Sequence, residues 1–280
     1  MPTISIGLPV YNGGDHLKTC LESILAQSFQ DFEVFISDNS STDNTQQICE
    51  HFARIDSRIT YVRQPDNIGA ASNFRFVFER TSSPLFKWMA HDDWIDDDWL
   101  SQLVPAAIKE QAIVFGHLQM ITYQGEMMAH QANGRAMQYA GKPLWRQLAY
   151  AIEPANLGKA NVIYGIFPRH VVTNKSFEIF SGYGAPGDVM MLTNCLERVP
   201  VLSIGASRLY KRAAPIKTAG TQGELRPSIF ERTMLRQFMA LGPLSFKLGY
   251  LSLYPVTLMR MKFERKLRRW VSRLSRGGRN

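Results

Sequence analysis

The sequence contains little cysteine, and its three cysteines form no recognisable pattern. Cys20, Cys49 and Cys195 are odd in number and widely separated, so neither a disulfide framework nor a zinc-binding spacing is present. The first residues, MPTISIGLPVYN, also lack the basic stretch and the apolar run of a secretory signal. Both absences favour a protein that works in a reducing, cytoplasmic setting.

Acidic residues are scarce toward the C-terminus. Residues 231–280 contain twelve Lys and Arg against two acidic residues, so this segment carries +10, and the remaining 230 residues sum to −2 of the net +8. The hydrophobic content of 45% is sufficient for a packed core and excludes a wholly disordered chain. We therefore predict a globular unit over residues 1–218 and a helical, basic C-terminal extension over residues 219–280.

Strand and helix patterns alternate through the first half of the chain. Apolar runs at 4–12, 32–37, 58–64 and 85–90 are each followed by a polar segment, and helical spacing of apolar residues resumes after it. This alternation predicts an α/β fold with a mostly parallel central sheet flanked by helices. Ligands bind at the carboxyl ends of the strands in such sheets. The polar segments expected to meet there are Asn12–Asp15, Asp38–Asp43, Asp66–Asn73 and Asp92–Asp93.

One of these segments, KWMAHDDWIDDDW at residues 87–99, concentrates five carboxylates directly after an apolar run. Carboxylates at a strand end suit a divalent cation, because Mg²⁺ and Mn²⁺ prefer oxygen ligands and can join carboxylates to a phosphate group. Asp92 and Asp93 are the candidate ligands, and the alternative is that they cap the following helix. We interpret Asp96–Asp98 as the N-terminus of that helix, where acidic residues interact favourably with the helix dipole.

Four segments in sequence resemble the family 2 glycosyltransferases with the GT-A fold: GLPVYNGGDHLKTCLESILAQSF, FEVFISDNSSTDNT, RQPDNIGAASNF and WMAHDDW. The resemblance covers Thr3 to Tyr210. It implies a Rossmann-like GT-A unit that moves a sugar from a nucleoside-diphosphate sugar, UDP favoured, to an acceptor hydroxyl, with inversion at the anomeric carbon. It also implies a divalent metal, Mn²⁺ or Mg²⁺, and a role in the synthesis of cell-surface polysaccharide or lipid-linked glycans.

The resemblance further implies the residues of the donor site. The implied donor-binding residues are Pro9, Tyr11, Asn12, Asp38, Asn67, Gly69 and Asp92, and the implied metal ligands are Asp92 and Asp93. In the family, an aspartate at the position of Asp38 accepts a hydrogen bond from the nucleobase; the alternative here is an Asx turn with the serines that follow. The Tyr11 ring either flanks the base or packs in the ordinary way. Gly69 is either near the nucleotide or a turn glycine.

The chain departs from the family pattern in two places. Ala90 replaces the first acid of the metal motif, and the neighbouring His91 is a sugar contact or a loop residue. The loss of the first acid puts the affinity for metal in doubt but not its use, and a metal ligand is a third possibility for His91. The family places Glu-Asp before a downstream helix. Here Gly187 replaces the glutamate, and Asp188 is the expected general base, with a helix cap or first-turn acid as the alternative. Arg169 is a candidate for a phosphate or acceptor contact.

The C-terminal extension raises the question of a membrane. Residues 238–259 are apolar but interrupted by Lys, Gly and Pro, which argues against a simple span. Residues 260–279 place Phe, Leu and Trp at helical spacing between Arg and Lys, a pattern typical of a helix on an anionic membrane surface. The alternative is a helix packed on the globular unit. The first interpretation predicts a location at the inner face of the membrane, and the family resemblance implies a saccharide or lipid-linked acceptor. We expect no nucleic-acid partner, since one basic helix without a recognised module is weak evidence for one.

Two other functions remain open on the sequence alone. A nucleotidyltransferase also binds nucleotides through carboxylates and a metal, but LPVYNGGDH lacks the basic residue expected of its phosphate loop. A non-catalytic relative of the GT-A fold, acting as a binding module, would accommodate the acids that are missing before Asp92 and Asp188. Loss of metal-dependent donor binding would favour this second alternative.

Overall fold

The computed structural model describes residues 1–184, 186–213, 237–239, 245–253 and 255. Strands and helices alternate along the first half as predicted. The elements of this half are β1 (Ile4–Val10), α1 (Gly14–Leu25), β2 (Phe32–Asp38), α2 (Thr45–Ile55), β3 (Ile59–Arg63), α3 (Ala70–Glu79), β4 (Leu85–Trp88), β5 (Trp94–Ile95) and α4 (Trp99–Glu110). The later elements are β6 (Ile113–Ile121), α5 (Pro143–Ile152), η1 (Ala155–Leu157), η2 (Lys159–Tyr164), β7 (Phe167–Pro168), η3 (Arg169–Val171), α6 (Asn174–Gly182), α7 (Gly187–Cys195) and β8 (Val201–Arg212).

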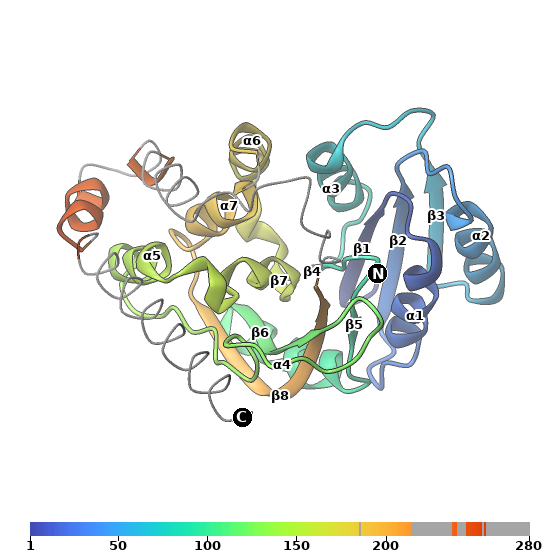
Figure 1. Ribbon diagram of the computed structural model, residues 1–280, viewed down its shortest axis with the longest axis horizontal. Helices are drawn as coiled ribbons and strands as arrows, with labels where there is room; N and C mark the ends of the chain where they lie inside the picture. The colour runs from blue at the N-terminus through green and yellow to red at the C-terminus, as the bar shows by residue number, and fades with distance from the viewer. Residues whose placement is uncertain (185, 214–236, 240–244, 254, 256–280) are drawn as a thin grey trace, which may run out of the picture.

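The main sheet has the order β3-β2-β1-β4-β7, with the first four strands parallel and β7 antiparallel to β4. All seven residues of β1 are buried, as expected for a central strand of a parallel sheet covered on both faces. Val10 pairs with Asp38, and Asp38 pairs with Arg63, so the carboxyl ends of β1, β2 and β3 lie at one edge (Figure 1). The predicted α/β architecture with a mostly parallel sheet is confirmed.

The core beside β4 is built around the fully buried Trp88. Its ring meets Phe86 edge-on at 4.7 Å between centroids and stacks with Phe78 at 5.8 Å. Its indole nitrogen donates to the carbonyl of Phe74 at 3.0 Å, which ties α3 to the sheet. On β1, a Cβ at Gly7 would lie 2.5 Å from the Phe86 ring, so only glycine fits this close approach.

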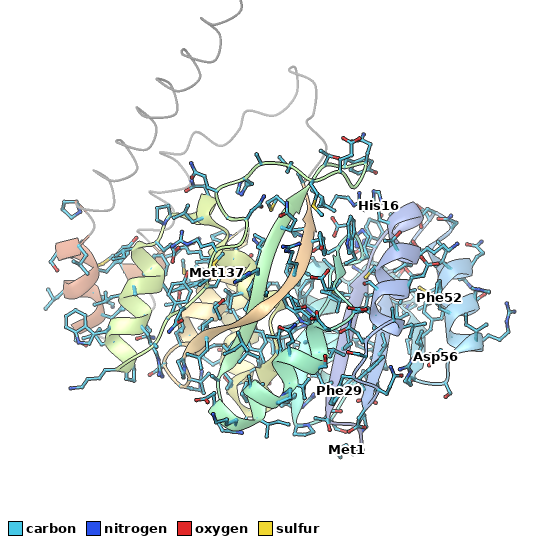
Figure 2. All side chains as sticks on the ribbon, turned by 90° about the horizontal axis from the view of Figure 1, so that it is seen from below. Met1, His16, Phe29, Phe52, Asp56 and Met137 are labelled. Atoms are coloured by element: carbon cyan, nitrogen blue, oxygen red, sulfur yellow. The ribbon has the colours of Figure 1, made fainter. Side chains whose placement is uncertain are left out.

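A second sheet has the strand order β5-β8-β6. In this sheet β8 lies beside β5, which belongs to the acidic segment. Trp94 of β5 pairs with Tyr210 of β8, and their rings stack 5.2 Å apart. β8 also pairs along its length with β6, and Figure 2 shows these two strands side by side, with α1 and α2 on the far side of the molecule. Lys211 and Arg212 therefore lie beside Asp92 and Asp93.

Two parts of the middle region differ from the prediction. The pattern of residues 161–172 predicts a strand and a turn, but η2, a two-residue β7 and η3 occupy it. Helix α6 was not predicted. It begins with a capping box in which Thr173 and Ser176 exchange side-chain and backbone hydrogen bonds. Short elements of this kind are fixed by tertiary packing, so their sequences carry little periodic signal.

The described residues of the C-terminal extension pack against α5. Phe238, Phe246 and Tyr250 are buried and lie ring against ring, with Phe246 stacked on Tyr250, and a Cβ at Gly249 would lie 2.8 Å from Leu148 of α5. The predicted basic amphipathic helix at 260–279 lies outside the described residues. In the part of the chain that is described, no helix has both the length and the apolar character needed to cross a membrane.

Candidate active site

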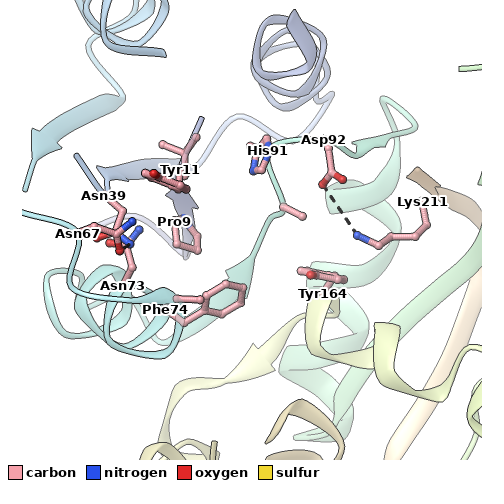
Figure 3. Close-up of a pocket in the computed structure, with 13 residues that line it drawn as sticks. Pro9, Tyr11, Asn39, Asn67, Asn73, Phe74, His91, Asp92, Tyr164 and Lys211 are labelled. Atoms are coloured by element: carbon pink, nitrogen blue, oxygen red, sulfur yellow. Dashed lines mark hydrogen bonds and ion pairs between the residues drawn. The ribbon is translucent and has the colours of Figure 1, made fainter. Parts of the chain in front are cut away.

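A pocket of about 300 Å³ opens at the carboxyl edge of the main sheet (Figure 3). It is lined by Pro9, Val10, Tyr11, Asn39, Asn67, Ala70, Asn73, Phe74, Ala90, His91, Asp92, Tyr164 and Lys211. Four of the predicted donor-site residues, namely Pro9, Tyr11, Asn67 and Asp92, are among them. The loops at the strand ends therefore meet around a cavity, as predicted. Lys211 of the second sheet lines its other side.

One half of the pocket combines amide groups with ring surfaces. Asn39 donates from Nδ2 to Oδ1 of Asn67 at 2.9 Å, and its own Oδ1 accepts the backbone N–H of Ile68 at 2.8 Å. These bonds hold the loop after β3 against the loop after β2. Tyr11 is 46% exposed at the mouth, and Phe74 lies across the pocket from it in Figure 3. Such a half-pocket suits a flat heterocycle with hydrogen-bonding edges.

Asp38 is occupied inside the protein rather than lining the pocket. Its side chain is fully buried. Oδ1 accepts the backbone N–H of Ser41 at 2.8 Å, as in the predicted Asx turn. Oδ2 accepts the Tyr61 hydroxyl at 3.0 Å and an Arg63 N–H at 2.9 Å. With both oxygens engaged, Asp38 braces the ends of β2 and β3, and its neighbour Asn39 is the residue that reaches the pocket.

Asn12 and Gly69 shape loops beside the pocket but do not line it. Asn12 has φ of 50°, and its Oδ1 accepts the backbone N–H of Thr42 at 2.9 Å, which joins the first two loops. Gly69 precedes α3 with φ of 82° and ψ of 157°, a conformation essentially restricted to glycine. Its conformation accounts for the glycine at this position.

The other half of the pocket is built around Lys211. Its Nζ donates to Oδ2 of Asp93 at 2.9 Å and lies 3.9 Å from Oδ1 of Asp92 and 5.0 Å from the centre of the Tyr164 ring (Figure 3). Arg212 adds its backbone N–H to Oδ1 of Asp93 at 3.0 Å and its guanidinium to the carbonyl of Asp92 at 3.0 Å. The pairing of β8 with β5 fixes both cations against the acidic segment.

Lys211 keeps its charge in this setting. Burial disfavours the ammonium, but Tyr164, Asp93 and Asp92 outweigh burial and raise the pKa of Lys211 above its ordinary value. Burial likewise raises the pKa of Asp93 to about 6, with Lys211 acting in the opposite direction. Both groups are therefore ionised at neutral pH, and they form a buried ion pair at the floor of the pocket.

The side chains present do not fit the predicted Asp92–Asp93 metal site. Asp93 is buried and uses both oxygens for Lys211 and Arg212, while Ala90 offers no ligand. Asp92, with a side chain 33% exposed, is the one member of the pair that faces the pocket. Within the described ranges, no group of three or more His, Cys, Asp or Glu side chains is arranged to hold a metal ion.

His91 lines the pocket between the two halves. Burial lowers its pKa, and the nearby Lys211 acts in the same direction, although Asp92 opposes both. The imidazole is therefore neutral at pH 7 and is available as a hydrogen-bonding group.

Asp188 lies in the first turn of α7. Its Oδ1 accepts the backbone N–H of Val189 at 2.7 Å. Burial raises its pKa, against the opposing influence of that backbone bond and of the positive charges of Lys159 and Lys211. Its own charge in turn raises the pKa of Tyr164. Asp188 is thus outside the set of lining residues but within electrostatic reach of the cationic half.

Arg169 is not placed near the pocket. Its guanidinium donates to the carbonyls of Phe78 and Thr81 and lies 4.2 Å from the centre of the Phe78 ring. Its backbone N–H donates to the carbonyl of Pro84, just before β4, so Arg169 lies at the amino end of β4, whereas Asp92 follows its carboxyl end. This position corrects the suggestion that Arg169 contacts phosphate or acceptor.

The sequence interpretation missed several pocket residues. Asn39 and Asn73 lie within segments expected at this edge but were not named as site residues, and Phe74, Tyr164 and Lys211 were not expected at all. Tyr164 and Lys211 had no signal in the sequence, because their place in the pocket depends on η2 and on the pairing of β8 with β5.

Comparisons with known proteins identify the family of the chain. The profile described as Glycosyl transferase family 2 matches residues 5–169. Glycosyltransferase GlyA of Streptococcus pneumoniae serotype 4 is 31% identical over 109 residues, which are 39% of this chain and 16% of that protein. A Campylobacter jejuni protein named GalNAc(5)-diNAcBac-PP-undecaprenol beta-1,3-glucosyltransferase is 25% identical over 179 residues, 63% of this chain and 55% of that protein. The matched region is therefore less than two thirds of either relative.

The fold is also similar to solved structures. The structure of Staphylococcus aureus TarS 1–349 in complex with UDP-GlcNAc matches with a TM-score of 0.61 and 17% identity, covering 89% of this chain and 71% of that chain. At this identity the likeness concerns the fold, and it confirms the predicted GT-A architecture. Since the family profile matches more than half of the sequence, the chain belongs to glycosyl transferase family 2.

Proposed function

We propose that the protein is an inverting glycosyltransferase that moves a sugar from a nucleoside-diphosphate sugar to an acceptor hydroxyl. The observation that carries the proposal is the two-part pocket. Amides and rings at one end suit a nucleoside, and a fixed ammonium at the other suits a diphosphate. The donor sugar would then project beyond the diphosphate, toward the side where Asp188 acts.

The nucleotide end favours UDP in this proposal. Asn39 and Asn73 line this end, and each already bonds inside the protein, Asn39 with Asn67 and Ile68 and Asn73 with Ser37. Each amide nitrogen has a second N–H and each amide oxygen a second lone pair, which can serve the edge of uracil, and Tyr11 offers a ring face at the mouth. The structurally similar TarS was solved with UDP and with UDP-GlcNAc, which supports the same donor class for this chain.

Asp188 acts as the general base. The acceptor oxygen attacks the anomeric carbon from the face opposite the diphosphate, and its proton passes to the Asp188 carboxylate. The bond from the anomeric carbon to the diphosphate oxygen breaks, and the nucleoside diphosphate leaves with the electron pair. The raised pKa of Asp188 makes it a stronger base than an exposed aspartate.

The acceptor is a saccharide or a lipid-linked glycan, and the biological role is the synthesis of cell-surface polysaccharide or lipid-linked glycans. The undecaprenol-linked substrate in the name of the Campylobacter jejuni relative supports this class. We further propose that the protein acts at the inner face of a membrane, which it contacts through its basic C-terminal segment. That segment lies outside the described residues.

The test is calorimetric titration of UDP and GDP, each in Mn²⁺ and in EDTA, followed by an assay for slow hydrolysis of nucleotide sugars. We expect one nucleotide to bind, with UDP preferred, and Tyr11→Ala to weaken that binding by about tenfold through loss of ring contact. The exposed Tyr123→Ala serves as a control. Folded protein that binds neither nucleotide in any buffer would rule the proposal out. Binding without turnover would instead favour a non-catalytic relative.

A further inference from the structure

Asp92, Asp93, Lys211 and Arg212 form a cluster of two carboxylates and two basic side chains. Lys211 pairs with both carboxylates, whereas Arg212 donates from its guanidinium to the backbone carbonyl of Asp92 and from its backbone N–H to the Asp93 carboxylate. A bare pair of carboxylates would repel a diphosphate and would need a divalent cation between them. Here two side chains of the same chain provide the charge that such a cation would bring.

Lys211 also has the geometry to contact a diphosphate. Its ammonium has three N–H donors, and Asp93 takes one of them at 2.9 Å. Its side chain is 21% exposed and lines the pocket, whereas Asp93 beneath it is 0% exposed. Donors remain on the pocket side, next to the neutral His91 and opposite the amide half.

The position of Lys211 is held from three sides. Strand pairing of Trp94 with Tyr210 fixes the backbone, Asp93 anchors the ammonium, and the Tyr164 ring lies 5.0 Å from it. A cation that is fixed before the ligand arrives loses little entropy on binding and stabilises charge as it develops on a leaving group.

We propose that Lys211, backed by Arg212, binds the donor diphosphate directly and replaces the divalent cation, so that donor binding and sugar transfer proceed without metal. The inference rests on the proposed function, because it concerns the diphosphate of that donor. During transfer, the ammonium accepts the developing charge of the leaving diphosphate as hydrogen bonds and is neither consumed nor deprotonated. The loss of the first motif acid at Ala90 is consistent with a site that no longer needs metal ligands.

The first experiment titrates UDP into wild type and into Lys211→Met, each in EDTA and in Mn²⁺. We expect the wild-type Kd in EDTA to be within about threefold of that in Mn²⁺, and Lys211→Met to raise the Kd in EDTA by at least about tenfold. Lys18→Met removes an exposed charge from α1 and is the matched control, with no change expected. Lys211→Arg keeps the charge and should retain most of the binding.

A second variant keeps the test decisive if Lys211→Met does not fold. The double variant Asp93→Asn/Lys211→Met removes both members of the buried ion pair, so no uncompensated charge is left inside the protein. It should fold by circular dichroism and still lose UDP binding in EDTA. Wild-type binding of UDP that appears only with Mn²⁺ would overturn the inference while leaving the proposed function intact. A folded double variant that binds UDP as tightly as the wild type would also overturn the inference about Lys211. A wild-type protein that binds no nucleotide would overturn both this inference and the proposed function.

Discussion

A carboxylate is a stronger general base when its surroundings raise its pKa. Burial raises the pKa of Asp188, whereas the backbone hydrogen bonds at the start of α7 and the nearby Lys159 and Lys211 act in the opposite direction. Asp188 is therefore more basic than an exposed aspartate. At this residue the sequence prediction of a general base and the alternative of a first-turn acid are compatible, because Asp188 occupies the first turn of α7.

Asp188→Asn should lower kcat by about 10²- to 10⁴-fold with little change in UDP affinity, since the amide cannot accept the acceptor proton. In the wild type, kcat/KM should fall on the acid side as Asp188 becomes protonated, with the midpoint above the ordinary aspartate value of about 4. The measurement is a pH–rate profile from pH 4 to pH 8 with a nucleotide-sugar donor. A variant that keeps half of the wild-type turnover would exclude Asp188 as the base.

Asp38→Asn should reduce stability, since the fully buried carboxylate accepts bonds from Ser41, Tyr61 and Arg63. Loss of the charge-assisted bonds is expected to cost about 2 kcal/mol, or roughly 4–8 °C in Tm for a chain of this size. Thermal denaturation followed by circular dichroism checks this expectation. The exposed Asp66→Asn, in the next loop, is the control and should melt with the wild type. Equal melting of the two variants would contradict the bracing role of Asp38.

Elements were predictable from the sequence where packing imposes a simple pattern. β1, β2 and β4 are buried apolar runs that stop at polar loops, and the run at 143–152 is helical as its spacing indicates. The pattern of residues 161–172 suggests a strand, but packing against neighbouring elements turns it into the short 3-10 helices η2 and η3 around a two-residue strand. For the site, the loops after β1, β2, β3 and β4 were expected at this edge and each contributes a lining residue, whereas Lys211 was not expected, because nothing local marks the pairing of β5 with β8.

Helices α6 and α7 meet at Gly187, where the family pattern has a glutamate. A Cβ at this position would lie 2.2 Å from the backbone carbonyl oxygen of Phe180, and a backbone atom cannot rotate away. The glycine is therefore required by the close approach of two helices. Any side chain here would force α7, and Asp188 with it, away from α6.

Gly187→Ala should destabilise the protein by about 1–3 kcal/mol and lower turnover by moving Asp188. Gly187→Glu should destabilise the protein further, and it should not raise turnover although glutamate is the residue of the family pattern. The control is Gly182→Ala in α6, where a Cβ meets no atom within 4 Å. That substitution is expected to be neutral or slightly stabilising. Urea denaturation of the three variants provides the comparison. A Gly187→Ala variant as stable as Gly182→Ala would show that the helices can separate freely.

Within the part of the chain that the structure describes, Lys87 and Lys159 are buried without a carboxylate within bonding distance. Lys87 donates to the carbonyl of Tyr164, and Lys159 donates to the carbonyls of Tyr150 at 2.8 Å and Ala151 at 3.1 Å. Burial lowers the pKa of each lysine to about 7. In the unfolded chain both return to about 10.4, so unfolding takes up protons at both positions.

The free energy of unfolding should therefore rise from pH 7 to pH 8, by about 1 kcal/mol for each buried lysine. Stability rises with pH because the unfolded state binds more protons than the folded state, so a lower proton concentration disfavours the unfolded state. This rise in stability should end near pH 8. Burial raises the pKa of the three cysteines, so above pH 8 the unfolded chain loses thiol protons that the folded protein keeps, and stability falls as the pH rises further. Urea titrations at pH 7.0, 7.5 and 8.0 measure the slope.

Lys87→Met and Lys159→Met should each flatten this slope, whereas Lys109→Met, at a side chain 82% exposed, should leave it unchanged. A wild-type stability that is constant or falls between pH 7 and pH 8 would contradict the neutral state of these lysines.

The pocket joins residues from Pro9 to Lys211, and this span has a consequence for protein synthesis. As the chain leaves the ribosome, β1 to β4 can pair and their loops can gather at one edge long before β8 exists. The nascent protein then presents the nucleoside half without the ammonium. Only when β8 docks against β5 does the charge arrive. A ribosome stalled just before residue 201 would hold a chain that already contains all five strands of the main sheet but lacks Lys211, the residue proposed to bind the diphosphate.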